Sequence, residues 1–470
     1  MAKSSTPLTK SQILGLTALS FAVFLIANDL TAFAVAIPTI ERDFHSDITT
    51  AQWVMNGYTL VFGVLIITGG RLADMFGRRR IFFIGSAIFV FFSLLGGFAV
   101  DMWMLLICRA LMGIGGALMW PAILGMIYGL MPEDRSGLAG GLIMAVCGVS
   151  NSIGPMLGGT LTDLLSWRWI FFINIPIAML ACLMCWKVVA DDSAEKMEEK
   201  VDYVGVTTLS ISLFGLLVAL DIAVDIGFKN PLTVFLIVVF LLFMGFFIIV
   251  ERRVGKFALI PPDVAGNRKF FAAGVTTLLL SAIWFSALLY IPQFLSKVHG
   301  YSAMVSGLGL LPIMITQGIV SYISGSLYEK LGAKLIVSVG TVFLCAGMFM
   351  LSHLHKDTTF AQMIPGLIVL GVGVGLFYST ITTAAITVVD PSRSSLAGAI
   401  LYMFQIAGGA LGLGMNTTIV AMAPDLPTGI DRAFTVNAYL ALAGLVVSIL
   451  FVSGKAVKVE IEEEGGPLSI

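Results

Sequence analysis

The sequence is short of charge. Only 12% of its 470 residues are Asp, Glu, Lys or Arg, whereas 58% are hydrophobic and the mean hydropathy is +0.98. A soluble protein of this length would not normally carry so much apolar surface. A soluble enzyme is therefore excluded, and we expect no nucleic-acid partner. The net charge of -1 gives no information about other partners.

Cysteine and histidine are scarce as well. The five cysteines fall in or beside apolar runs, and the CxxC spacing of Cys182 and Cys185 is typical there of packing residues. The four histidines include the pair His353 and His355, which alone does not make a metal site. We therefore expect no metal and no cofactor. A membrane enzyme would need a cluster of His, Asp or Ser at the interface, and we find none in the sequence. A channel would need a charge ring or a filter loop, and none is visible.

Long apolar runs are what the sequence has instead. Uncharged stretches of about 18 residues or more indicate membrane-spanning helices, because helices satisfy the backbone in lipid. Fourteen runs are of this kind, the first broken only by Asp29, at residues 11–40, 48–70, 81–100, 110–131, 136–162, 169–186, 203–220, 230–250, 270–296, 300–328, 335–352, 358–389, 394–424 and 433–454. The sequence thus predicts an all-α polytopic membrane protein.

The distribution of basic residues predicts the orientation. Most of the 27 Lys and Arg fall in loops on the side of the N-terminus, so both termini are expected in the cytoplasm. The first run is too long for a cleavable signal peptide, and we expect it to remain as the first span.

Two short motifs recur in the chain. GRLADMFGRRR follows the second run and GSLYEKLGAK follows the tenth, and LAGG and LAGA lie near the starts of the fifth and thirteenth runs. With runs seven and eight set aside, two six-helix halves align, which favours a transporter with its site between them. The expected units are an N-terminal bundle (1–190), a linker with two additional helices (191–262) and a C-terminal bundle with a short cytoplasmic tail (263–470).

Four segments carry a resemblance to a known family. They are the loop after the second run, LICRALMGIGGA from Leu106, SNSIGPMLGG from Ser150 and WRWIFFINIP from Trp167. Asp29, Thr31, Ala36 and Pro38 add to the match. The sequence resembles the major facilitator superfamily and, within it, the fourteen-span drug:proton antiporters. It departs from the usual pattern at Met75, Met112 and Ser150.

The resemblance implies the major facilitator fold, with two six-helix bundles and two inserted helices (14 transmembrane helices). It also implies a monomer in a bacterial inner membrane. The residues expected to form a conformational latch between the halves are Gly70, Asp74, Gly77, Arg78, Arg79, Gly325 and Glu329. The alternative is that the arginines only set the topology. The residues expected to bend the fifth helix and seal the halves are Gly154, Pro155, Gly158 and Gly159.

Asp29 is the one carboxylate inside the first run. It lies about eleven residues, or ~16 Å, from the outer end of its span, and Arg109 lies ~9 Å deep in the fourth. Such buried ionisable residues are costly and usually functional. We therefore expect Asp29 and Arg109 to form a proton-coupling site, as the resemblance also implies. The alternative is a static ion pair. Asp221 and Asp225 are interpreted as a solvated helix end, with a second titrating site as the alternative.

Polar and aromatic residues within apolar runs are candidates for a substrate cavity. They are Asn28, Asn56, Tyr58, Trp120, Asn151, Trp284, Tyr290, Gln293, Gln317, Tyr378, Tyr402 and Gln405. The leading hypothesis is an antiporter that takes up protons and exports a lipophilic small molecule. The sequence has no nucleotide-binding loop, so we do not expect transport to be driven by ATP hydrolysis. The alternatives are a transporter of a specific metabolite or siderophore, and a non-transporting membrane sensor.

Overall fold

The computed structural model describes residues 7–46, 48–189, 202–255 and 258–452. These residues form helices and contain no strand. Fourteen spans among them are long and apolar enough to cross a membrane, which confirms the predicted fold class. Several helices extend beyond the uncharged runs: the last one begins at Leu426 and includes Asp431 and Arg432.

The first half of the molecule contains six long helices. They are α1 (Lys10–Asp43), α2 (Ile48–Phe76), α3 (Arg78–Gly97), α4 (Met102–Leu130), α5 (Ser136–Leu164) and α6 (Arg168–Val188). The second half repeats this pattern. Its helices are α10 (Arg268–Lys297), α12 (Leu311–Leu331), α13 (Ala333–Leu351), α14 (Phe360–Thr387), α15 (Ser394–Ala421) and α16 (Leu426–Phe451). The short α11 (Ala303–Leu308) precedes α12 within the same span.

The turns after α2 and α12 show the internal repeat in the backbone. Gly77 separates α2 from α3 with a φ of 96°, and Gly332 separates α12 from α13 with a φ of 77°. Positive φ angles suit glycine because it lacks a Cβ atom. The two glycines that match in the sequence therefore make corresponding turns in the two halves.

Two inserted helices, α7 (Tyr203–Ile226) and α8 (Pro231–Val254), lie between the halves in the sequence. α7 packs against α8, α2 and α15, so it contacts both halves. α8 is strongly apolar and mostly exposed, as expected for a helix that faces lipid. The four-residue α9 (Pro262–Ala265) follows before the second half begins.

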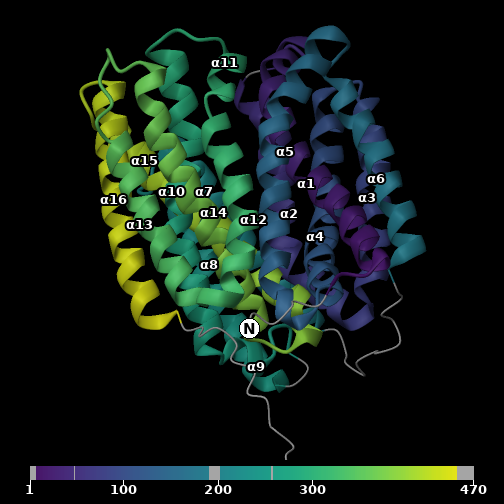
Figure 1. Cartoon of the computed structure of the whole chain (residues 1–470). Coiled ribbons are helices and arrows are strands. Elements are labelled where there is room, and N and C mark those ends of the chain that lie inside the picture. Colours follow the sequence, from purple (N-terminus) through teal and green to yellow (C-terminus); the bar gives the residue numbers. More distant parts are fainter. Residues whose placement is uncertain (1–6, 47, 190–201, 256–257, 453–470) are drawn as a thin grey trace, which may run out of the picture.

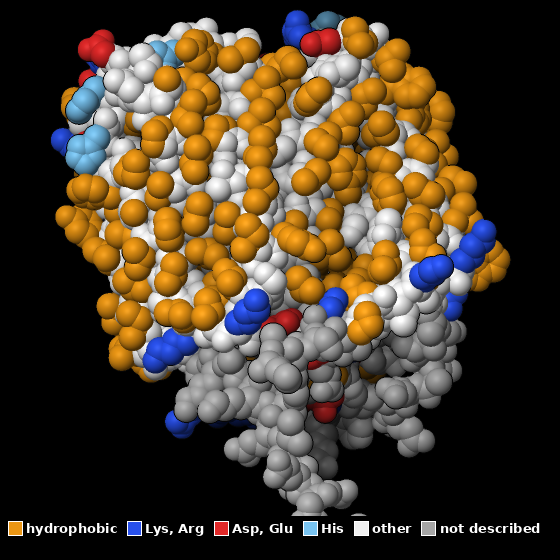
Figure 2. All heavy atoms as spheres, in the orientation of Figure 1, with side chains coloured by type: hydrophobic (Ala, Val, Ile, Leu, Met, Phe, Trp, Pro, Cys, Tyr) orange, Lys and Arg blue, Asp and Glu red, His pale blue; other side chains and the backbone are white. Residues whose placement is uncertain are grey.

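The helices cross the molecule in alternating directions (Figure 1). We call the end where α1 begins and α2 ends the basic end, because Arg78, Arg79 and Arg80 lie there. α16 ends at the same end. Figure 2 shows hydrophobic side chains over the middle of the visible face, with Lys and Arg side chains gathered toward the lower, basic end. This pattern is that of a protein surrounded by a lipid belt.

Candidate functional site

A buried ion pair lies at the centre of the first half. Arg109 Nη1 on α4 donates to Asp29 Oδ2 on α1 at 2.6 Å, and both side chains are fully buried. The structure therefore brings together the two residues that the depth argument paired. Removing one partner of such a pair is strongly destabilising, because it leaves the other charge buried without compensation.

The Arg109 guanidinium is held by more than its carboxylate partner. Its Nε donates to the Val54 carbonyl oxygen at 2.9 Å. Its Cζ lies 4.2 Å from the ring centroid of Phe33 and 4.7 Å from that of Tyr58. Aromatic faces attract a guanidinium, and more strongly when water is absent. The position of Arg109 is thus fixed by α1 and α2 together.

Asn174 on α6 completes the environment of the carboxylate. Its Nδ2 donates to Asp29 Oδ1 at 2.8 Å and lies 3.3 Å from Ser93 Oγ. Ser93 in turn donates to the Phe171 carbonyl oxygen at 2.9 Å. The sequence analysis did not single out Asn174 or Ser93. The available signal was an amide within an otherwise apolar run, which is the signal that identified Asn28.

In the second half, a neutral network joins the helices that correspond to α1 and α6. Asn437 Nδ2 on α16 donates to Ser286 Oγ on α10 at 2.9 Å and to Asn416 Oδ1 at 3.3 Å. α10 and α16 are the first and last helices of their half, as α1 and α6 are of theirs. Buried amide and hydroxyl groups can be satisfied without a charge. The acid–base pair is therefore a feature of the first half.

The motif after α2 joins the two halves at the basic end. The Asp74 carboxylate accepts hydrogen bonds from the backbone amides of Ser395, at 3.3 Å, and Leu396, at 2.8 Å. These amides belong to the N-terminus of α15, where the helix dipole favours a negative charge. Arg78 Nε lies 3.1 Å from Asp74 Oδ1, and Arg78 Nη2 donates to the Pro391 carbonyl oxygen at 2.6 Å. The two halves are therefore connected at this end.

Asp390 supports the segment that Arg78 binds. Hydrogen bonds from the Ser392 side chain and backbone amide hold the pKa of Asp390 below its usual value. The charged carboxylate caps the short 3-10 helix (Pro391–Arg393).

The matching motif of the second half makes a related contact. Glu329, near the end of α12, lies close to the backbone amide of Gly137 on α5. A Cβ atom added to Gly325 would lie 2.6 Å from the Gly137 carbonyl oxygen, so these backbones touch. Arg79 makes a contact within the first half: its Nη2 donates to the Trp186 carbonyl oxygen on α6 at 2.8 Å. The predicted inter-half role of Arg79 has no support in this contact.

The later glycines of α5 were expected to contact the second half, but they contact α1 instead. Gly154, Gly158 and Gly159 face Thr31, Ala32 and Val35 of α1, within their own half. Gly137, Gly141 and Gly148 instead approach α12 of the second half. Helix α5 thus uses two faces without bulky side chains, and sequence spacing alone does not reveal which neighbour each face meets. Pro155 lies near Gly307 of α11.

The cavity candidates divide into groups. Trp120 and Tyr402, from opposite halves, have ring centroids 5.1 Å apart, and Phe62 lies 5.7 Å from Tyr402. Tyr58 stacks on Phe62 at 5.9 Å. The sequence analysis missed Phe62 because phenylalanine is common in lipid-facing positions. We call Tyr58, Phe62, Trp120 and Tyr402 the aromatic cluster.

The other candidates lie elsewhere. Asn28, which precedes Asp29 in the sequence, is buried on α1, and Gln317 is buried on α12. Tyr290 pairs with Thr417 at 2.9 Å, and Tyr378 donates to Ser281 at 3.2 Å, so both serve packing within the second half. The remaining candidates are the buried Trp284, the partly buried Asn151 and Gln405, and Gln293, whose Oε1 accepts from Lys297 near the end of α10.

Asp221 is not simply a solvated helix end. Asn56 Nδ2 on α2 donates to Asp221 Oδ1 at 3.1 Å, and Asp221 is partly buried. This contact fixes α7 against the first half and occupies Asn56 there. No group of three His, Cys, Asp or Glu that could hold a metal ion occurs among the residues that the structure describes.

Comparison with known proteins gives a consistent set of relatives. A family model described as Major Facilitator Superfamily matches residues 19–413, and again residues 274–469. A puromycin resistance protein of Streptomyces alboniger is 33% identical over 452 residues, which cover 94% of this chain and 88% of the relative. Multidrug resistance protein 3 of Bacillus subtilis is 31% identical over 412 residues, with 87% and 79% covered. A tetracenomycin C resistance and export protein of Streptomyces glaucescens is 29% identical over 407 residues, with 86% and 75% covered.

Proposed function

We propose, since the chain belongs to the major facilitator superfamily of membrane transporters, that it is a proton-coupled antiporter that exports lipophilic small molecules or drugs. The observation that carries the proposal is the buried pair of Asp29 and Arg109. A charged pair is expensive to keep inside a membrane protein, and the second half packs its corresponding helices with a neutral network instead. The cost is accounted for if Asp29 takes up and releases a proton.

The geometry supports a simple coupling step. When Asp29 accepts a proton, its attraction for Arg109 is lost, and the guanidinium retains its contacts with Val54, Phe33 and Tyr58. Arg109 Nη2 is buried and has no hydrogen-bond partner among the described residues, so it can donate to a new acceptor. Because Arg109 touches α1 and α2, a change in its pairing alters the contact between these helices. Protonation is thereby linked to the arrangement of the first half.

The aromatic cluster supports a lipophilic substrate. It joins side chains of α2, α4 and α15 across the boundary between the halves. The Trp120 Nε1 and Tyr58 hydroxyl are buried without a hydrogen-bond partner among the described residues. Apolar surface with a few free polar groups suits lipophilic ligands that need limited hydrogen bonding. The resistance proteins among the relatives are consistent with such substrates.

The latch supports alternating access. We place the basic end in the cytoplasm, because basic loops favour that side. The hydrogen bonds of Asp74 and Arg78 to the second half then close the cytoplasmic side in this conformation. Release of this contact would let a substrate enter from the cytoplasm, and its formation would direct the substrate outward.

Proton release on compound addition tests the proposal. The purified full chain in weakly buffered detergent receives puromycin, tetracenomycin C or another lipophilic compound, and a pH-sensitive dye reports released protons. We expect release from the wild type and none from Asp29→Asn. Asp221→Asn serves as a control, because it removes a carboxylate from the contact between α7 and α2. It is expected to release protons like the wild type.

The other outcomes are equally informative. Equal release from wild type and Asp29→Asn would move the proton site away from Asp29. Loss of proton release only in Asp221→Asn would assign the proton site to the inserted helix α7. Measurable binding without release from any protein would contradict proton coupling and leave an uncoupled transporter.

A further inference from the structure

The two halves meet along two lateral seams. Helix α2 packs against α15 along one, and α5 packs against α12 along the other. In a molecule made of two similar halves, these seams are equivalent by position. The inserted helices break that equivalence, because they lie on one side only.

Helix α7 covers the seam between α2 and α15. A Cβ atom added to Gly63 of α2 would lie 2.9 Å from a Leu217 methyl group on α7. On the other side of this seam, the Phe228 ring lies close to Gly414 of α15. The hydrogen bond between Asn56 and Asp221 holds α7 in place. Lipid is therefore kept away from this seam by protein.

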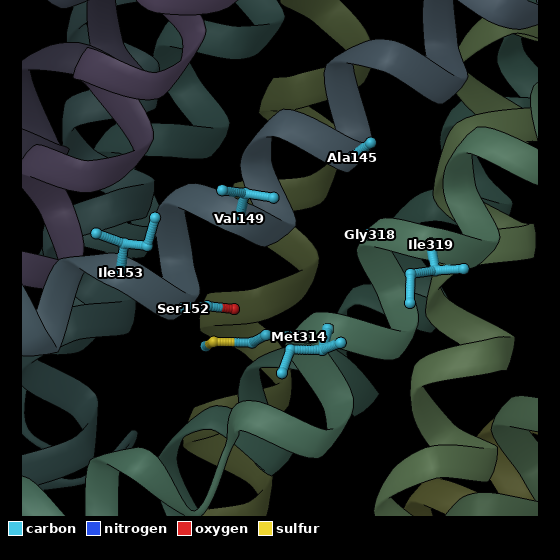
Figure 3. Close-up of a pocket in the computed structure, with 8 residues that line it drawn as sticks. Ala145, Val149, Ser152, Ile153, Met314, Gly318 and Ile319 are labelled. Carbon is cyan, nitrogen blue, oxygen red and sulfur yellow. The ribbon is translucent and has the colours of Figure 1, made fainter.

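Among the residues that the structure describes, no inserted helix covers the seam between α5 and α12. Its helices touch through their backbones from Gly137 to Gly148. A Cβ atom at Gly148 would lie 3.0 Å from the Met314 carbonyl oxygen. Around this last contact the seam widens into a cavity of ≈ 410 Å³. Figure 3 shows Val149 and Ser152 of α5 on one side of it and Met314 and Ile319 of α12 on the other.

The cavity lies deep in the membrane. Val149 is thirteen residues from the start of α5, or ~20 Å along the helix, and Ile315 is sixteen residues from the end of α12, or ~24 Å. Both distances are measured from the basic end of helices that cross a hydrocarbon layer of about 30 Å. Val149, Ile315 and Ile319 are 51%, 53% and 58% exposed, so the cavity opens toward lipid.

The lining offers no polar recognition. Its one hydroxyl, on Ser152, donates to the Gly148 carbonyl oxygen at 2.8 Å within the same helix. No charged side chain lines it. A site of this size falls in the range of ligand cavities, about 300–1,000 Å³. Its chemistry and depth select a hydrocarbon chain.

We propose that the cavity between α5 and α12 binds an acyl chain of a membrane phospholipid, and that α7 excludes lipid from the opposite seam. The chain lies between helices of different halves, so its fit depends on how the halves are placed. A ligand that binds one arrangement better shifts the population toward it. This inference does not depend on Asp29 or on proton coupling.

Photolabelling with a lipid tests the proposal. The full chain is reconstituted in phosphatidylcholine vesicles that contain a fraction of phosphatidylcholine with a diazirine in the middle of one acyl chain. After irradiation, mass spectrometry compares residues 314–319 with residues 234–242 of α8, which report lipid that merely surrounds the protein. We expect several-fold enrichment at 314–319 and no labelling of residues 56–63 beneath α7.

Two tryptophan variants provide the matched comparison. Val149→Trp fills the cavity and is expected to reduce labelling of residues 314–319 to the α8 level. Leu183→Trp on α6, at a residue that is also half-exposed, is expected to leave it unchanged. Ile319→Trp, read at residues 145–153, replaces the first variant if that protein does not fold.

Three results would overturn the proposal. Labelling of 314–319 at the α8 level in the wild type would mean surrounding lipid only. Unchanged labelling in Val149→Trp would place the lipid outside the cavity. Loss of labelling on addition of excess puromycin would assign the cavity to a transported compound instead of a phospholipid.

Discussion

The carboxylate of Asp74, at the end of α2, accepts a 2.8 Å hydrogen bond from the backbone amide of Leu396, at the start of α15. Hydrogen bonds to charged groups contribute about 1.5–3 kcal/mol. We therefore expect Asp74→Asn to open the basic end. Spin labels at the exposed Arg80 and Lys334 should report a longer and broader distance distribution than in the wild type. Asp357→Asn, which removes an exposed charge from a distant loop, should leave the distribution unchanged; the same change in both variants would argue against a latch.

The contact between Gly137 and Gly325 gives a steric prediction. A Cβ atom at Gly137 would clash with the Gly325 carbonyl oxygen, so Gly137→Ala is expected to push the halves apart at the basic end. We expect a loss of transport of roughly tenfold or more, since ~1.4 kcal/mol already gives a factor of ten. Gly245→Ala on α8 is the control because its added Cβ meets nothing within 4 Å. The measurement is the rate of compound transport in vesicles that contain each variant. Equal rates for Gly137→Ala and Gly245→Ala would contradict the prediction.

Asn174 is expected to act as a positioning residue for Asp29. Asn174→Ala removes a hydrogen bond to the Asp29 carboxylate, so the pH profile of proton release should differ from that of the wild type. Asn437→Ala removes the equivalent amide of the second half, where no carboxylate is paired. It should lower the thermal stability and leave the profile in place. Identical profiles for both variants would reduce Asn174 to a packing role.

Arg109 should tolerate neither loss of charge nor a change of shape. Arg109→Ala leaves Asp29 buried without its cation, which costs about 3–5 kcal/mol. Arg109→Lys keeps the charge but loses the fork that reaches both Asp29 and the Val54 carbonyl oxygen. Thermal unfolding in detergent should therefore rank the wild type above Lys and Lys above Ala. A lysine variant as stable as the wild type would show that charge alone is sufficient.

The sequence predicted the features that follow from the length of the apolar runs and from the depth of a residue within its span. Each apolar run became a helix because a backbone in lipid has few other ways to satisfy its polar groups. Asp29 and Arg109 meet because they lie at similar depths below the outer end of their spans, as counting residues along each span predicted. The repeated glycines, Gly77 and Gly332, make the same turn because both need positive φ.

Helix rotation was the part that the sequence left open. Gly154 and Gly158 face α1 instead of the second half, and Asn174, which the sequence analysis did not single out, faces Asp29. Which side of a helix meets which neighbour depends on the packing of all helices around it. The position of α7 over one seam is of the same kind, because its apolar residues are not concentrated on one face of the helix.

The ion pair in the first half also bears on membrane voltage. With Asp29 ionised, the pair of Asp29 and Arg109 has no net charge, and the transmembrane field exerts little force on it. With Asp29 protonated, the uncompensated charge of Arg109 remains inside the first half. Moving one charge through the full potential corresponds to about 2.3 kcal/mol per 100 mV. The electrical part of the proton gradient would then act on the protonated conformation alone, and only on the half that contains Arg109.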